Sequence, residues 1–140
     1  MKLHFLGTGG GRYAMGEQLR KTGGIIMETD ETRIHIDPGP GALVNTHDRM
    51  KEPMETDAVL VSHAHPDHSN DANAIIEMMT ECAKKPGALF ANETVLEGYG
   101  DIEKVVDSYH EDLCATVRTL ENDSEYQFQD LKIESQHMFH

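Results

Sequence analysis

The stretch that decides the fold reads Ser62-His63-Ala64-His65-Pro66-Asp67-His68, and it holds three histidines and one aspartate. It comes directly after the apolar run Ala58-Val59-Leu60-Val61. Imidazole and carboxylate groups bind divalent metals at neutral pH. This string therefore offers enough ligands for two metal ions.

The spacing of these residues suits metal binding. His63 and His65 are two positions apart, so in an extended segment both imidazoles point the same way and can reach one ion. Pro66 then turns the chain, which lets Asp67 and His68 address a second ion nearby. The string lies between a buried strand and a helix, where layered α/β domains place their chemistry. We therefore predict a metal site at the end of this strand.

Composition narrows the class of protein. The chain has 140 residues, of which 26% are charged and 38% hydrophobic, and its mean hydropathy is −0.53. This profile predicts one globular domain over residues 1–140, with no membrane span and no signal peptide, and a cytoplasmic location. The formal net charge of −13 argues against nonspecific binding to nucleic acid. The two cysteines show no Cys-x-x-Cys pairing, so we expect free thiols, with Cys82 buried as a small hydrophobic residue.

Apolar patterning predicts alternating strands and helices. We expect a loop over 12–23 and a helix over 72–85 that Asn70 or Asp71 caps and Pro86-Gly87 ends. The other expected helices are 42–50 and 102–113. The expected strands are 3–6, 24–29, 33–37, 57–62, 88–91, 116–120, 126–128 and 131–135. This order is typical of an α/β layered domain.

The string Ser62–His68 resembles the His-x-His-x-Asp-His motif of the metallo-β-lactamase fold superfamily. The opening Phe5-Leu6-Gly7-Thr8-Gly9-Gly10-Gly11 is similar to the first strand and glycine loop of its ribonuclease Z and phosphodiesterase-like branches. The segment Ile34-His35-Ile36-Asp37-Pro38-Gly39 resembles the strand that ends in a structural aspartate. The resemblance implies an αββα sandwich with the metals at one edge.

The same resemblance implies a role for each residue of the motif. His63 and His65 would bind the first metal, and Asp67 and His68 the second. Asp37 would orient these ligands through hydrogen bonds. The third histidine on the first metal would be His140, with His137 as the alternative. The isolated histidines His4, His35, His47 and His110 are expected to be structural or exposed.

The chain departs from the family pattern near its end. A later aspartate that bridges the metals and a further histidine on the second metal have no counterpart before His140. The second half of the sandwich has none either. We therefore expect the 140 residues to be the N-terminal portion of a longer enzyme, with an incomplete sandwich.

The resemblance implies a metal-dependent hydrolase that uses metal-activated water, with Asp67 helping to orient the water. We expect two divalent ions, zinc first, with manganese or iron as alternatives. The expected substrate is a small-molecule phosphodiester or similar ester. A nucleic-acid substrate is less expected but not excluded, and the chain could form a homodimer.

Two other functions are alternatives. One is a non-catalytic metal-binding or interaction module on this fold, and the other is a di-iron oxidoreductase of the superfamily.

Overall fold

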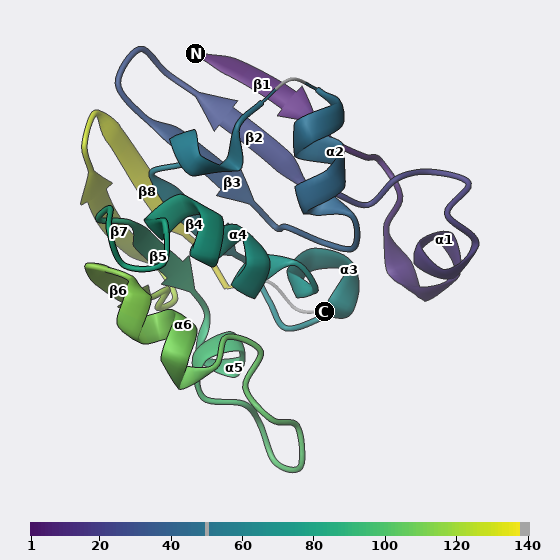
Figure 1. Ribbon diagram of the computed structural model, residues 1–140. Helices are drawn as coiled ribbons and strands as arrows, with labels where there is room; N and C mark the ends of the chain where they lie inside the picture. Colours follow the sequence, from purple (N-terminus) through teal and green to yellow (C-terminus); the bar gives the residue numbers. More distant parts are fainter. Residues whose placement is uncertain (50, 138–140) are drawn as a thin grey trace.

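The computed structural model describes residues 1–49 and 51–137, and a six-stranded mixed sheet forms its centre (Figure 1). The strands lie side by side in their order along the chain. The first two pairings are antiparallel, and the next three are parallel. The strands are β1 (Lys2–Phe5), β2 (Ile25–Glu28), β3 (Arg33–Ile36), β4 (Ala58–Val61), β5 (Ala88–Ala91) and β6 (Thr116–Thr119). The expected burial of β4 is confirmed, because three of its four residues are buried.

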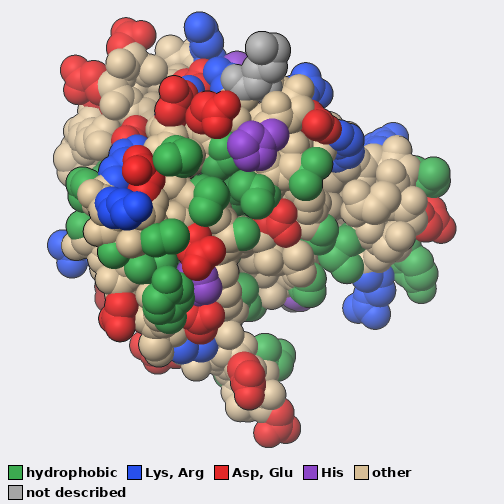
Figure 2. All heavy atoms as spheres, in the orientation of Figure 1, with side chains coloured by type: hydrophobic (Ala, Val, Ile, Leu, Met, Phe, Trp, Pro, Cys, Tyr) green, Lys and Arg blue, Asp and Glu red, His purple; other side chains and the backbone are tan. Residues whose placement is uncertain are grey.

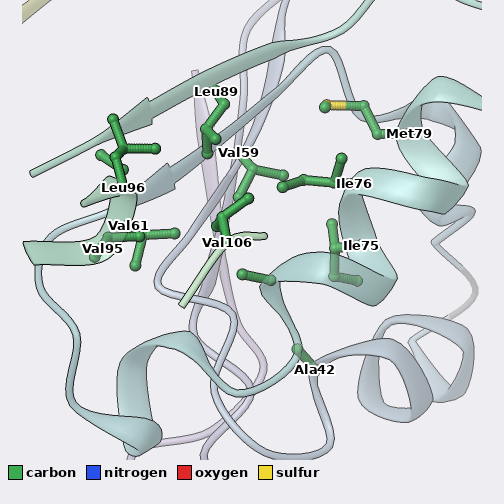
Figure 3. Packing of buried hydrophobic residues seen from close by; sticks show 12 residues of the cluster. Ala42, Val59, Val61, Ile75, Ile76, Met79, Leu89, Val95, Leu96 and Val106 are labelled. Carbon is green, nitrogen blue, oxygen red and sulfur yellow. The ribbon is translucent and has the colours of Figure 1, made fainter. Parts of the chain in front are cut away.

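Helices cover one face of the sheet, and their apolar side chains form the larger of two buried clusters (Figure 3). Ile75, Ile76 and Met79 recur at helical spacing and are fully buried against Val59 and Leu89 of the sheet. The helices are α1 (Gly11–Glu17), α2 (Ala42–Asp48), the 3₁₀ turn η1 (Pro53–Glu55), α3 (Pro66–Ser69), α4 (Ala72–Thr80), α5 (Glu93–Leu96) and α6 (Ser108–Leu113).

A two-stranded hairpin packs on the opposite face of the sheet. Its strands are β7 (Ser124–Phe128) and β8 (Leu131–Ser135). Phe90 of β5 contacts two aromatic rings of the hairpin. Its ring centroid lies 5.5 Å from that of Phe128 and 6.3 Å from that of Tyr126. The hairpin therefore adds a second β-layer over part of the sheet.

Every expected strand occurs, with small shifts of boundary, but the short helices α1, α3 and α5 lie outside the expected helices. The prediction of a loop over 12–23 is wrong, because α1 occupies its first half. That helix buries none of its residues, so its sequence carries no apolar period for a pattern to detect. The expected helix over 102–113 begins only at Ser108, since Asp107 caps it by accepting a hydrogen bond from the His110 N–H at 3.0 Å.

The helix expected over 72–85 ends early, at Thr80. Glu81, Cys82 and Ala83 all have positive φ angles, which a right-handed helix does not contain. The Asp71 side chain forms no cap and instead accepts a hydrogen bond from the N–H of Leu43 at 3.2 Å. The prediction that Cys82 is buried is also wrong, because the residue is exposed on this turn. Both thiols are free, as expected.

On the face drawn in Figure 2, Asp and Glu side chains are scattered among Lys, Arg and hydrophobic side chains. The formal net charge of the chain is −13. Within residues 1–49 and 51–137, no helix has the length and apolar character needed to cross a membrane.

Glu28 is the centre of an ion-pair network at one end of β2. Its carboxylate lies 2.7 Å from the Arg33 guanidinium and 2.8 Å from both Lys51 Nζ and His4 Nε2, and its side chain is 13% exposed. Burial by itself raises the pKa of Glu28, but the hydrogen bonds from Lys51 and His4 and the charge of Arg33 lower it to about 2. The network therefore stabilises the fold only while Glu28 is ionised.

The stability contributed by Glu28 is expected to be complete above about pH 5 and lost as the pH falls toward 2, because a depressed pKa favours folding above the unfolded pKa. The contribution is on the order of 2 kcal/mol. Urea unfolding of the wild type and Glu28→Gln at pH 7 and pH 3 checks this. The difference in unfolding free energy between the wild type and Glu28→Gln should be smaller at pH 3 than at pH 7. An equal difference at both pH values would contradict a stabilising role for ionised Glu28.

Candidate functional site

The parallel arrangement of β3, β4 and β5 brings three chain segments to one edge of the sheet. Asp37 follows β3, Ser62 follows β4, and Asn92 follows β5. Strands that run in the same direction end at the same edge, so residues far apart in the sequence meet there. The edge gathers the polar side chains of the candidate site.

The three histidines of the motif lie together at this edge. The ring centroid of His63 is 4.7 Å from that of His65 and 4.2 Å from that of His68. Nε2 of His68 is 3.4 Å from Oδ2 of Asp67. Pro66 opens the short helix α3, which turns Asp67 and His68 back toward the other two histidines.

Asp37 organises this cluster by hydrogen bonds. Its Oδ1 accepts from the N–H of Ser62 at 2.7 Å, and its Oδ2 accepts from the Ser62 hydroxyl and from Nδ1 of His68, both at 2.8 Å. Nδ1 of His63 is 3.0 Å from the Ser62 Oγ. Because the single hydroxyl proton goes to the carboxylate, His63 must donate from Nδ1 to that oxygen. With Nδ1 engaged in both His63 and His68, Nε2 is the ring nitrogen left to bind a metal ion, and metal binding would require it to be unprotonated.

Asp67 is an ionised carboxylate held by the glycine loop. Its Oδ2 accepts a hydrogen bond of 2.5 Å from the N–H of Gly11. Burial alone would raise the pKa of Asp67. The hydrogen bond from the Gly11 N–H and the neighbouring His68 outweigh this effect, so the pKa of Asp67 lies below its ordinary value. Gly11 has φ +78°, a conformation that favours glycine, so the loop can bring its N–H close to Asp67.

The structure brings together five of the predicted site residues, namely His63, His65, Asp67, His68 and Asp37. His137 lines the same cavity as His63 and His65, whereas His140 lies outside the described residues. Three imidazoles and a carboxylate suit a divalent ion such as zinc. In the described ranges 1–49 and 51–137, however, no three His, Cys, Asp or Glu side chains are arranged around one point as a metal would require. Metal binding by these residues stays a prediction.

Ser62 is the residue that sequence reasoning missed. It lacks the flanking glycines of a serine nucleophile, and its side chain instead links Asp37 to His63. The sequence feature that could have indicated this role is the position of Ser62 directly before the first histidine of the motif. The isolated histidines lie elsewhere: the buried His35 donates from Nε2 to the Gly23 carbonyl, and His4 and His110 pair with carboxylates.

Gly39 is where the loop after β3 contacts the backbone of α3. A Cβ on this residue would lie 2.0 Å from the carbonyl oxygen of Asp67 and 2.4 Å from that of Thr22. Both neighbours are main-chain atoms, which cannot swing aside as a side chain does. Only glycine therefore allows the loop to hold Asp67 in place.

The substitution Gly39→Ala is expected to cost about 3 kcal/mol of unfolding free energy, because the loop and α3 must separate. Gly16→Ala is the matched control. Nothing lies within 4 Å of a Cβ at Gly16, and the residue is helical, so alanine there should stabilise the protein by about 0.5–1 kcal/mol. Urea unfolding measures both. A Gly39→Ala protein as stable as the wild type would refute the close approach.

Comparison with known proteins agrees with this architecture. A family model described as the beta-lactamase superfamily domain matches residues 32–138. The chain is 39% identical over 141 residues to the uncharacterized protein MJ1374 of Methanocaldococcus jannaschii, and the match covers 100% of this chain and 53% of that protein. The chain thus spans about half the length of the curated relative it matches.

Two solved structures share the fold at low sequence identity. The metallo-β-lactamase fold protein YhfI from Bacillus subtilis superposes with a TM-score of 0.67 at 17% identity, over 93% of this chain and 49% of YhfI. A diphosphatase from the PhnP family superposes with a TM-score of 0.61 at 18% identity, over 94% of this chain and 54% of that one. The expected superfamily and fold are confirmed: the chain belongs to the β-lactamase superfamily and forms about half of a metallo-β-lactamase fold.

Proposed function

We propose that the chain carries the first half of the active site of a metal-dependent hydrolase acting on a phosphodiester or similar ester. The observation that carries this is the convergence of His63, His65, His68 and Asp67 at one sheet edge, with Asp37 fixing the orientation of His68. The superfamily contains hydrolases, and one fold neighbour is named a diphosphatase. The cytoplasmic location also stays part of this proposal.

Each residue has a distinct part in the proposed site. His63 and His65 would hold one divalent ion, and His68 and Asp67 a second, with His137 or His140 completing the first. Bound divalent ions would act as Lewis acids. They would lower the pKa of water, which would make it a better nucleophile at neutral pH. Asp67 also accepts hydrogen bonds as an ionised carboxylate, so it is suited to orienting the attacking water. Asp37 and Ser62 keep the imidazoles in the required tautomer.

Hydrolysis of bis(p-nitrophenyl) phosphate by the protein loaded with zinc or manganese tests the proposal. Asp67→Asn keeps the shape of the side chain and removes its charge, and it should lower kcat by about 100-fold or more. Asp48→Asn, on the exposed end of α2, is the control and should leave the rate unchanged. Turnover by the wild type that Asp67→Asn does not reduce would contradict the assignment.

A non-catalytic metal-binding module is the second candidate. It needs fewer ligands than a two-metal hydrolase, and the described residues bring together four candidates, His63, His65, Asp67 and His68. This candidate predicts bound metal with no turnover of activated phosphodiesters or lactones. The hydrolysis assay therefore separates the two functions.

A further inference from the structure

A cavity of about 820 Å³ opens beside the histidine cluster. Its walls come from the segments that follow the three parallel strands β4, β5 and β6, and from the end of β8. His63 and His65 form part of the same wall. The volume lies within the range of small-molecule binding sites, so a substrate at the histidine cluster would extend into it.

Most of the surface that lines this cavity is apolar. Its apolar members come from the sheet, the hairpin, the histidine segment and the segment after α5: Leu60, Ala64, Tyr99, Ile102, Leu120 and Ile133. Tyr99 and Ile102 are 75% and 63% exposed, although large apolar side chains are usually buried. A ligand in the cavity would therefore cover apolar surface that is otherwise exposed to water.

The segment with Tyr99 and Ile102 is a tight, hydrogen-bonded turn that protrudes beyond α5 (Figure 1). The N–H of Tyr99 donates to the carbonyl of Ile102 at 2.9 Å, and the N–H of Ile102 donates back at 3.0 Å. Gly98 has φ +80°, and a Cβ there would lie 2.4 Å from the Ile102 oxygen. The main chain of the turn that carries the two apolar residues is therefore fixed by its own hydrogen bonds.

The charged residues that line the cavity disfavour binding of an anion far from the histidine cluster. No lysine or arginine lines it within the described part of the chain, whereas Glu121 and Glu134 do, and the Glu134 carboxylate is paired with Lys132 at 2.7 Å. A distal phosphate or carboxylate would therefore lie near Glu121 in a protein of net charge −13, with no cation in the described lining to pair with. Positive charge would be present only where metal ions are bound, at the histidine end.

We propose that this cavity accepts an apolar group of the substrate that carries no negative charge, such as an alkyl or aryl substituent on the scissile ester. This inference rests on the proposed hydrolase function. It narrows the substrate class from esters in general to a small ester whose one anionic group lies at the metals. It also excludes a polynucleotide, whose next phosphate would lie in the cavity.

Isothermal titration of the metal-loaded protein with three phosphonates tests this proposal. Methylphosphonate, 4-(4-carbamoylphenyl)butylphosphonate and 4-(4-carboxyphenyl)butylphosphonate share one anionic head group, so its affinity for metal cancels in the comparison. The carbamoyl ligand should bind about 100-fold more tightly than methylphosphonate through burial of its apolar arm. The carboxy ligand should bind about 10-fold more weakly than the carbamoyl ligand, because its distal charge would lie near Glu121 with no lysine or arginine in the described lining.

Two substitutions link the preference to the cavity. Ile102→Gln should weaken binding of the carbamoyl ligand by about 5- to 10-fold. Leu19→Gln changes another exposed residue, 83% accessible and outside the cavity lining, and should leave the affinity unchanged. Equal affinity for the two long ligands, or no effect of Ile102→Gln, would overturn the proposal. Methylphosphonate binding and phosphodiester hydrolysis report on the metal site separately, so failure of the cavity proposal is distinct from failure of the hydrolase function.

Discussion

Replacing Asp37 with asparagine is expected to weaken binding of a divalent metal ion by about 10- to 100-fold. The carboxylate accepts three hydrogen bonds, two from Ser62 and one from His68. An amide accepts on one atom only, and its NH₂ group would face a donor. His68 would then lose the acceptor of its Nδ1, and the Ser62 hydroxyl, which contacts Nδ1 of His63, would lose its own acceptor.

The backbone should tolerate the change, which isolates the side-chain effect. Asp37 has φ +50°, a conformation that asparagine adopts more readily than most residues. Competition with a chelator of known affinity measures zinc binding. Asp48→Asn, whose parent side chain pairs with Lys21 at the surface, is the control. Wild-type affinity in Asp37→Asn would show that the carboxylate does not position the ligands.

The substitution Phe90→Ala is expected to lower the unfolding free energy by about 3–5 kcal/mol. Phe90 is 2% exposed and contacts the rings of Tyr126 and Phe128. Alanine would leave a void between the sheet and the β7–β8 hairpin, so hairpin amides should also exchange their hydrogens faster. Urea unfolding and hydrogen exchange measure the two consequences.

Leu3→Ala is the matched control for this prediction. Leu3 lies on the edge strand β1 and is 49% exposed, so its truncation should cost less than about 1 kcal/mol. Phe90→Leu should fall between the two, because it keeps most of the buried volume. A Phe90→Ala protein that loses no more stability than Leu3→Ala would mean that the hairpin is held by other contacts.

Most candidates for the site could be named from a local pattern, because His63 to His68 form one contiguous string. Asp37, at the end of a predicted strand, was named only through the family resemblance. Parallel pairing of β3 and β4 then places both at one edge. The Ser62 hydroxyl link and the Gly11 contact to Asp67 were not predictable, because each depends on three-dimensional distances that no spacing encodes.

The strands were easier to predict than the helices for a related reason. A strand buried in the sheet, such as β5 with all four residues buried, shows a continuous apolar run. The helix α1 buries nothing, and α5 has only four residues, so neither gives a periodic signal. The early end of α4 depends on left-handed residues at Glu81, Cys82 and Ala83, which are not types that favour this conformation.

Metal content per chain tests the central claim most directly. The wild type, His63→Ala and His47→Ala would be dialysed against zinc and analysed by atomic mass spectrometry, with the exposed His47 as control. At least one zinc ion per chain is expected in the wild type and in His47→Ala, and a clear loss is expected in His63→Ala. Equal zinc content in all three proteins, or none in any of them, would contradict the assignment of the Ser62–His68 segment as a metal site.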